Sequence, residues 1–179
     1  MVIAGAERKG YGPAMLTVLI VCGPDPSGLV ATFGSLLPSC VAGLTADVIV
    51  VADEPESLRA TCDPVGAVAV SPDEAGAALA DARGDWVLVL EAGARPAGEW
   101  MPAVAAHVSR AGARAARFEV SGRGEPFWRR LIGRAHRALR AGFLIPRDGA
   151  VAALRTTTPA RLPVGRAAVT LAARLAPAP

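Results

Sequence analysis

Four side chains that could bind a polar ligand follow closely on runs of apolar residues: Asp25, Asp53, Glu91 and Arg95. The clearest of these runs is 86–90 (WVLVL), which Glu91 follows directly. In an open α/β sheet, ligands bind beyond the carboxyl ends of the strands. A carboxylate in that position can accept hydrogen bonds from sugar hydroxyls or hold a cation, and a guanidinium can balance negative charge on a ligand. The spacing therefore places candidate binding chemistry in the segment 91–95.

The apolar runs also predict the strands that would position these residues. Five runs of suitable length lie at 16–22, 46–51, 65–70, 86–90 and 115–120. The run 86–90 is rich in β-branched and aromatic residues, which is typical of a strand covered on both faces. Segments with helical spacing separate the runs, and such alternation predicts βαβ units. We therefore expect an α/β fold, a three-layer sandwich with a mostly parallel central sheet.

Two of the carboxylates have a structural alternative to ligand binding. Asp25 or Ser27 could cap a helix that begins near residue 29, because Asp and Ser are preferred at helix N-termini. Asp53 could likewise cap a short helix over 55–61. Both functions of these side chains stay open at the level of the sequence.

Length and composition describe one globular domain. The chain has 179 residues, of which 52% are hydrophobic, enough to bury a sizeable core. No apolar run approaches the roughly 18 residues of a membrane span. The cysteines are widely spaced and form no C-x-x-C, which argues against a zinc site and fits a reducing, cytoplasmic compartment. Residues 1–14 are expected to be a disordered tail, and 156–179 a C-terminal extension with a short helix over 165–175.

Charge is distributed unevenly along the chain. Residues 1–107 carry 13 acidic and 5 basic side chains, whereas residues 108–179 carry 3 acidic side chains and 14 arginines. Such asymmetry predicts an anionic partner for the second half, for example phosphate groups or lipid headgroups. A coding bias could explain the preference for arginine over lysine, but it does not explain why the arginines crowd together. Nucleic acid is not expected as the partner, because no aromatic residues are interleaved in a recognisable module.

The segment 125–141 (EPFWRRLIGRAHRALRA) predicts a basic amphipathic helix. An apolar stripe headed by Phe127 and Trp128 is flanked by five arginines: Arg129, Arg130, Arg134, Arg137 and Arg140. A basic helix with an aromatic start is typical of a peripheral contact with the inner face of the cell membrane, through anionic lipid headgroups or a lipid-linked acceptor. Alternatively, the stripe simply covers the sheet.

The segment 82–100 resembles the centre of a family 2 glycosyltransferase, which has a GT-A fold. In that family the pattern runs A-x-G-D-(W/Y), a hydrophobic strand, L-D-x-D, then (R/x)-P and a helix that contains Trp. Matching residues here are Ala82, Gly84, Asp85, Trp86, Leu90, Arg95, Pro96 and Trp100. Glu91-Ala92-Gly93 stands where the family has D-x-D, and no E-D pair follows residue 120. The resemblance extends over residues 15–155, which it identifies as a short, divergent GT-A-like domain.

The resemblance implies a nucleotide-sugar donor. Gly23 and Asp25 lie in the loop that contacts the nucleotide in the family, and Asp53 matches an aspartate that recognises the base or ribose. Glu91 and Arg95 would lie near the sugar and the diphosphate. Asp148 belongs to a stretch similar to the family's (P/x)-x-G-D-Q-G segment and is the candidate catalytic base.

The missing carboxylate limits the chemistry that the resemblance implies. Glycine has no side-chain oxygen, so Gly93 cannot supply the usual metal ligand. No metal or other cofactor is expected, and Mg²⁺ or Mn²⁺ would bind only if the degenerate motif keeps that capacity. The implied activity is transfer of a sugar from a nucleotide sugar to an acceptor, such as a lipid-linked one. The alternative is a non-catalytic binding or scaffold protein that recognises an anionic partner through the arginine-rich second half.

Overall fold

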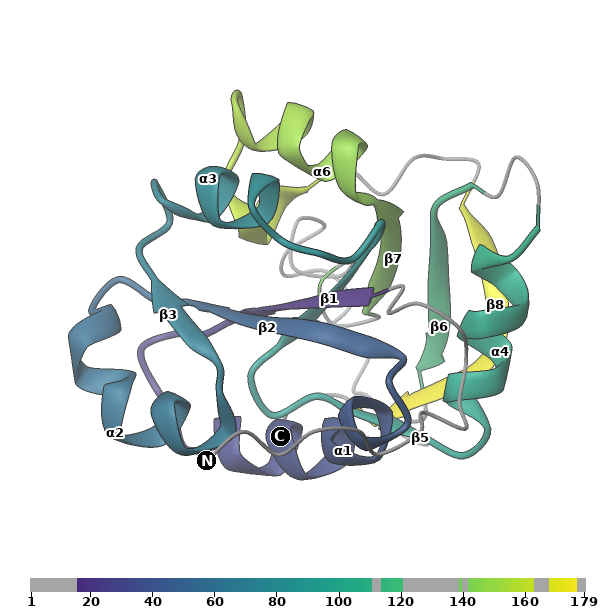
Figure 1. Ribbon diagram of the computed structural model, residues 1–179, viewed down its shortest axis with the longest axis horizontal. Helices are drawn as coiled ribbons and strands as arrows, with labels where there is room; N and C mark the ends of the chain where they lie inside the picture. The colour runs from purple at the N-terminus through teal and green to yellow at the C-terminus, as the bar shows by residue number, and fades with distance from the viewer. Residues whose placement is uncertain (1–15, 111–113, 121–138, 140–141, 163–167, 177–179) are drawn as a thin grey trace, which may run out of the picture.

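The computed structural model of the protein describes residues 16–110, 114–120, 139, 142–162 and 168–176. Its centre is an eight-stranded sheet with the strand order β3-β2-β1-β4-β7-β6-β8-β5 (Figure 1). The strands are β1 (Leu16–Val21), β2 (Thr45–Val51), β3 (Val68–Val70), β4 (Trp86–Glu91), β5 (Arg95–Ala97), β6 (Ala116–Val120), β7 (Phe143–Pro146) and β8 (Val169–Ala176).

One half of the sheet is parallel, as the alternation of strands and helices predicts. The strands β3, β2, β1 and β4 are neighbours and run in the same direction. Their connections contain α1 (Leu29–Val41), the 3-10 helices η1 (Pro55–Leu58) and η2 (Asp63–Val65), α2 (Arg59–Cys62) and α3 (Ala75–Ala80). β3 is shorter than predicted because η2 occupies residues 63–65 and Gly66 then turns the chain with a φ of 69°.

The other half of the sheet is mixed, and the sequence predicts only β6 of its four strands. β7 lies antiparallel to both β4 and β6, β8 runs parallel to β6, and β5 is antiparallel to β8. The helix predicted for 165–175 is wrong, since β8 occupies Val169–Ala176. Leu171, Ala173 and Leu175 are buried on one face of β8. Alanines on both faces of the strand hide this alternation in the sequence.

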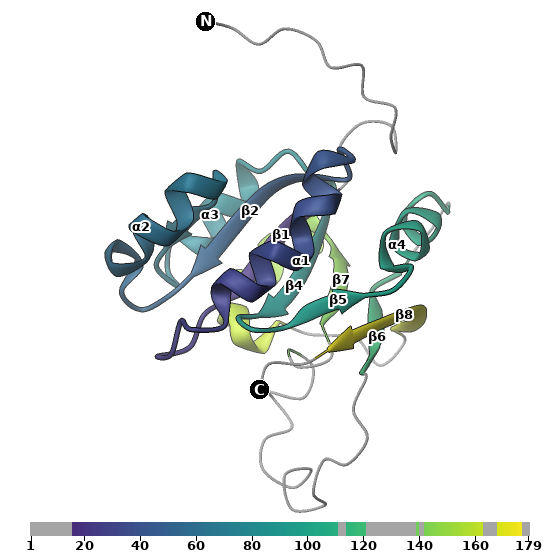
Figure 2. The same cartoon turned by 90° about the horizontal axis from the view of Figure 1, so that it is seen from below.

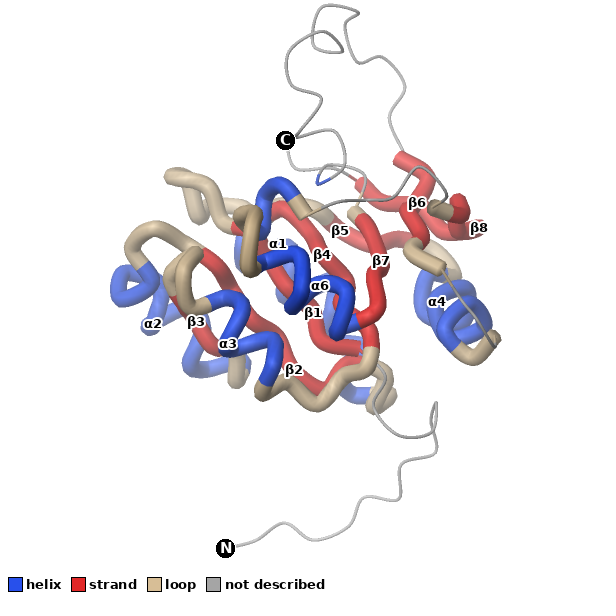
Figure 3. The backbone as a smooth tube through the Cα atoms, turned by 90° about the horizontal axis from the view of Figure 1, so that it is seen from above, coloured by secondary structure: helices blue, strands red, loops and turns tan. Residues whose placement is uncertain are grey.

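Helices cover both faces of the sheet. On one face lie α1, α2 and α4 (Trp100–Val108), and on the other lie α3 and α6 (Arg147–Leu154), as Figures 1 and 3 show. A short 3-10 helix, η4 (Pro159–Arg161), follows α6. Four of the seven strand pairings are parallel. The predicted three-layer α/β sandwich with a mostly parallel sheet is therefore confirmed. No helix in the described part of the chain has the length and apolar composition needed to cross a bilayer.

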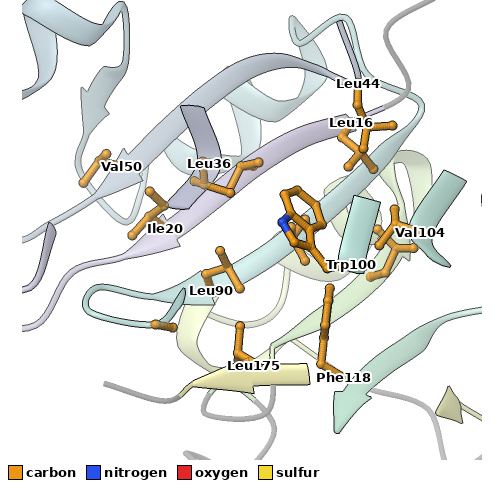
Figure 4. Packing of buried hydrophobic residues seen from close by; sticks show 14 of the residues in the cluster. Leu16, Ile20, Leu36, Leu44, Val50, Leu90, Trp100, Val104, Phe118 and Leu175 are labelled. Carbon is orange, nitrogen blue, oxygen red and sulfur yellow. The ribbon is translucent and has the colours of Figure 1, made fainter. Parts of the chain in front are cut away.

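The core lies on both sides of the central strands. In β1, alternate side chains face opposite helical layers: Leu16, Val18 and Ile20 belong to the cluster under α1, and Leu19 belongs to the cluster under α3. Figure 4 shows Trp100 of α4 with Leu90 and Phe118 from two different strands. This packing joins the parallel half of the sheet to the mixed half.

Candidate functional site

The carboxyl ends of β1, β2 and β4 lie level at one edge of the sheet, called the carboxyl edge below. Val21 of β1 is in register with Val51 of β2 and with Glu91 of β4. Backbone hydrogen bonds extend the register by one residue, from Cys22 N to the Val51 carbonyl at 2.8 Å and from Ala92 N to the Val21 carbonyl at 2.9 Å. The chain therefore brings four predicted site residues to this edge: Gly23, Asp25, Asp53 and Glu91.

The carboxylate of Glu91 is the unusual group at the carboxyl edge. The side chain is half-buried, and its Oε2 atom is buried without a hydrogen-bond partner among the described residues. A buried carboxylate oxygen that accepts no hydrogen bond costs on the order of 1–3 kcal/mol of stability. A ligand hydroxyl or amide that donates to this oxygen would remove that cost. Glu91 is therefore suited to ligand binding.

The segment 91–93 is closed on its other side by helix α1. Gly93 has a φ of 94°, and its N–H donates to Oγ1 of Thr32 at 2.8 Å. A Cβ atom added to Gly28 would lie 2.6 Å from Cα of Gly93, so the two glycine backbones are in direct contact. A left-handed φ and this close approach both favour glycine. This packing explains why no carboxylate stands at residue 93.

The described residues of this loop supply few ligands for a divalent cation. Glu91 supplies the only side-chain carboxylate of the segment 91–93. Across the described ranges, no group of three or more His, Cys, Asp or Glu side chains is placed to hold a metal ion. Mg²⁺ and Mn²⁺ prefer several oxygen ligands, so the loop could hold such an ion only together with oxygen atoms of a bound ligand.

The two aspartates at the carboxyl edge are exposed to solvent. Asp25 accepts a hydrogen bond from the backbone N–H of Ser27 at 2.9 Å, which lowers the pKa of Asp25 below its usual range. Asp53 does not cap a helix, because Glu54 precedes η1 and no side chain caps that helix. The capping alternative for Asp53 is therefore wrong. It is also wrong for Asp25 and Ser27, because Gly28 precedes α1 and no side chain caps that helix. The ends of β2 and β4 flank β1, so Asp53 and Glu91 follow strands about 10 Å apart.

Cys22 also lies at the carboxyl edge but is not a nucleophile. Its side chain is 9% exposed. Burial, followed by the negative charge of Asp25, raises the pKa of the Cys22 thiol. A thiol that stays protonated is inert, so catalysis through a covalent cysteine adduct is not expected.

Arg95 begins β5, immediately after the turn that leaves the carboxyl edge. The Ala94 N–H donates to the Glu91 carbonyl at 3.0 Å and closes this turn. The side chain of Arg95 is exposed, as are those of Arg117 on β6 and Arg174 on β8. In register, Arg174 lies between Ala97 of β5 and Glu119 of β6. Three arginines and one glutamate thus mark the exposed side of β5, β6 and β8, called the outer face below.

Asp148 does not join the other site residues. β7 runs antiparallel to β4, and its last residue, Pro146, pairs with Trp86 at the start of β4. The Arg147 N–H donates to the Asp85 carbonyl at 2.8 Å. Asp148 therefore lies at the amino end of β4, about 16 Å along the strand from Glu91. A base is needed beside the reacting atoms, so this geometry removes Asp148 from the site at the carboxyl edge.

Asp148 instead borders a shallow pocket of about 240 Å³ between α3 and α6, lined by Ala80, Arg147, Asp148, Val151, Ala152 and Arg155. The side chain of Asp148 is 96% exposed, and its Oδ1 lies 3.7 Å from Nε of Arg147. Arg147 also donates through Nη1 to the Ala82 carbonyl at 2.7 Å. The polar groups of this pocket thus hold α6 onto the amino end of the sheet.

Sequence reasoning missed the residues that shape the candidate site without binding anything themselves. Thr32 and Gly28 fix the segment 91–93, yet neither belongs to a recognisable motif. Gly84 of the G-D-W stretch also serves packing: a Cβ atom there would lie 2.4 Å from the backbone of Leu16 and Thr17. Gly84 could be singled out from the sequence because it belongs to the G-D-W stretch, but its packing role becomes visible only in the fold.

The five arginines of the predicted basic helix lie outside the described residues. Leu139, which belongs to the apolar stripe of the same segment, is described and is 3% exposed. It belongs to the core cluster that also contains Leu79 of α3 and Ala150 of α6. The expected tail at 1–14 also lies outside the described residues.

No protein-family model matches the sequence, and no curated protein does. Solved structures are similar in fold. Mannosyl-3-phosphoglycerate synthase from Rubrobacter xylanophilus has a TM-score of 0.53 and 15% identity, over 75% of this chain and 54% of that one. Glucosyl-3-phosphoglycerate synthase from Mycobacterium tuberculosis in complex with uridine diphosphate has a TM-score of 0.51 and 17% identity, over 76% and 58%.

The same Mycobacterium tuberculosis synthase, in complex with Mn²⁺, uridine diphosphate and phosphoglyceric acid, has a TM-score of 0.51 and 19% identity, over 76% of this chain and 57% of that one. At such low identities the similarity shows the fold alone. The chain has the GT-A-like α/β fold of these synthases, and it spans little more than half of their length.

Proposed function

We propose that this protein binds a nucleotide sugar at the carboxyl edge of β1, β2 and β4 and transfers its sugar, as a divergent relative of the family 2 glycosyltransferases. The observation that carries the proposal is the buried Oε2 atom of Glu91, which finds no hydrogen-bond partner in the described part of the chain. The GT-A-like fold supports it, because the carboxyl ends of parallel strands are where α/β folds bind ligands.

Each residue at the carboxyl edge has a proposed role that follows from its position. A hydroxyl of the donor sugar donates a hydrogen bond to Oε2 of Glu91. Asp53, which follows a strand about 10 Å away, accepts hydrogen bonds from a base N–H or a ribose hydroxyl. Gly23 and Asp25 follow the strand between them and contact the nucleotide, with the backbone of Gly23 beside the diphosphate. A nucleotide sugar has the sugar and the nucleoside at opposite ends of its diphosphate, which matches this order.

Transfer requires that negative charge on the leaving diphosphate be balanced. Because the loop supplies a single carboxylate, we assign that role to Arg95, an exposed residue at the start of β5, four residues after Glu91. Donor binding should accordingly be independent of Mg²⁺ and Mn²⁺. The acceptor hydroxyl must lose its proton to a base other than Asp148.

A second function, binding without transfer, is favoured by the position of Asp148. The candidate base lies at the amino end of β4, far from Glu91. A scaffold protein that kept the fold and the donor site would show this arrangement. The two functions share donor binding and differ only in turnover.

Calorimetric titration with uridine, guanosine and thymidine diphosphate sugars, each with and without Mn²⁺, tests donor binding. We expect one of them to bind equally well under both conditions. Glu91→Ala and Asp53→Ala should weaken that binding, whereas Asp148→Ala, the matched control at the opposite edge, should not. Absence of binding by all three donor classes would overturn the proposal. Release of nucleoside diphosphate in the presence of an acceptor then separates transfer from binding alone.

The outer face carries positive charge. Arg117 and Arg174 are exposed on the outer face, and the arginines at 129–140 belong to the same arginine-rich part of the sequence. Each basic residue near an anionic membrane contributes on the order of 1 kcal/mol. We therefore propose a lipid-linked acceptor and a peripheral, salt-sensitive contact with the cytoplasmic face of a membrane.

Co-sedimentation with vesicles tests this membrane contact. The protein should sediment with anionic phosphatidylserine vesicles at low salt and be released at high salt, because screening weakens exposed charges. Neutral phosphatidylcholine vesicles are the control. Equal binding to both vesicle types, or binding to neither, would contradict the proposal.

A further inference from the structure

Helix α1 buries one face and leaves an apolar face exposed. Its buried residues are Leu29, Thr32, Leu36 and Ser39. On the other side, Val30, Leu37 and Val41 are 66%, 60% and 80% exposed. Figure 2 shows α1 at the front of the molecule, with no other labelled helix or strand in front of it. A surface helix normally carries polar and charged side chains on its outer face, and α1 contains no charged residue at all.

The exposed residues of α1 are spaced as in a helix–helix contact. Val30, Gly34, Leu37 and Val41, called the α1 seam below, are separated by four, three and four residues. This is the spacing of the apolar positions in a coiled coil. Nothing lies within 4 Å of a Cβ atom added to Gly34, so the surface above this glycine is open. The seam thus has the large apolar side chain of Leu37 about one helical turn from the open surface above Gly34.

We propose that the α1 seam is the contact of a symmetric dimer, in which α1 of one copy packs antiparallel against α1 of a second copy. A two-fold axis that passes between residues 35 and 36 places Leu37 over the open position at Gly34 of the partner copy. The same axis places Val30 opposite Val41 at both ends of the contact. A two-fold contact requires a surface that complements itself, and this order of large and small residues meets that requirement.

Charge favours a second copy over a lipid surface as the occupant of the seam. Between residues 23 and 44, the one charged side chain is that of Asp25, which is acidic. Helices that lie on anionic membranes carry basic residues beside their apolar face. Two copies of an uncharged seam bring no like charges together. The membrane contact proposed above involves different residues, so the two surfaces do not compete.

The size of the seam indicates a weak, reversible dimer. A helix of 13 residues is about 20 Å long. A pair of such helices covers less than the roughly 800 Å² per partner that is usual for stable complexes. We therefore expect the monomer and dimer to exchange, with dimer accumulating only at high protein concentration. This inference does not rest on the proposed function.

Sedimentation velocity over a range of concentrations of the full chain tests the proposal. The wild-type protein should shift from monomer to dimer, and Leu37→Glu should weaken dimerisation about tenfold or more, because it places two carboxylates beside the two-fold axis. Val65→Glu is the matched control, since Val65 is 53% exposed in η2, away from the seam. Circular dichroism verifies that both variants remain folded. A protein that stays monomeric at all concentrations, or a dimer unaffected by Leu37→Glu, would overturn the proposal.

Disulfide crosslinking tests the antiparallel arrangement. In a Cys40→Ser background, the double variant Val30→Cys/Val41→Cys should form a linked dimer on mild oxidation, because the axis brings the two positions together. Either single variant should remain unlinked, because its two cysteines would be about 16 Å apart along the helices. Crosslinking of the single variants, or none in the double variant, would contradict this packing.

Discussion

The parallel strands β1, β2 and β4 begin at one edge of the sheet, called the amino edge below, and end at the carboxyl edge. Polar groups are used differently at the two edges. At the amino edge, Arg83 donates to both carboxylate oxygens of Asp47, and Gly84 N donates to Oγ1 of Thr17 at 3.2 Å. Arg147 donates to two carbonyls of the segment 82–85. At the carboxyl edge, Oε2 of Glu91 has no partner among the described residues. Polar groups at the amino edge therefore hold the fold together, whereas Glu91 remains available to a ligand.

The difference between the two edges explains which residues match the glycosyltransferase pattern and which do not. Gly84, Asp85 and Trp86 match the glycosyltransferase pattern and lie at the amino edge, where they position β4. Glu91 and Gly93 depart from the pattern and lie at the carboxyl edge, where the ligand would bind. Gly84, Asp85 and Trp86 thus report how the sheet is built and say nothing about its chemistry. When a motif match spans a whole strand, the residues at its amino end and those at its carboxyl end have to be interpreted separately.

The largest effect should come from the amino edge. In Gly84→Ala the new methyl group would lie 2.4 Å from the backbone of Leu16 and Thr17, which cannot move without disturbing β1. We expect a loss of about 3 kcal/mol, which lowers the melting temperature by roughly 6–12 °C. Thermal unfolding measures this change. Gly23→Ala is the control, because nothing lies within 4 Å of its added Cβ atom. A Gly84→Ala protein as stable as this control would show that the amino edge is not tightly packed.

A smaller effect should follow from loosening the carboxyl edge. Gly28→Ala places a methyl group 2.6 Å from Cα of Gly93 and should cost about 2 kcal/mol. The displaced segment 91–93 should also bind the donor sugar less tightly. Gly34→Ala in the same helix is the control and should stabilise the protein by up to about 1 kcal/mol. Chemical denaturation and calorimetry measure both quantities. Unchanged donor affinity in Gly28→Ala would show that the contact between Gly28 and Gly93 does not contribute to donor binding.

The smallest effect should come from the exposed ion pair of the amino edge. The side chain of Arg83 is 69% exposed and that of Asp47 is 24% exposed, so Arg83→Ala should cost less than about 1 kcal/mol. Donor affinity should not change. Arg59→Ala removes a fully surface ion pair with Glu56 and provides the matched control. If Arg83→Ala abolished donor binding, the assignment of the two edges to structure and to function would be wrong.

The parallel half of the fold was predictable from sequence because its strands are continuous apolar runs. The strands β1, β2 and β4 were placed within one residue at each end, and the edge that gathers Asp53 and Glu91 follows from their parallel order. The mixed half was not predictable to the same degree. β5 has only three residues, and alanines on both faces mask the alternation of β8. The position of Asp148 followed from the antiparallel direction of β7, which no local pattern encodes.

The most direct test replaces Glu91 with an uncharged side chain of similar size that accepts hydrogen bonds only weakly. Glu91→Met removes the buried oxygen that lacks a partner, so the ligand-free protein should be as stable as the wild type or more stable by about 1–2 kcal/mol. The same variant should lose measurable affinity for the donor sugar nucleotide that the wild type binds. Denaturant unfolding and calorimetry on one preparation give both values. Reduced stability together with unchanged donor affinity would show that Glu91 serves the fold and not a ligand.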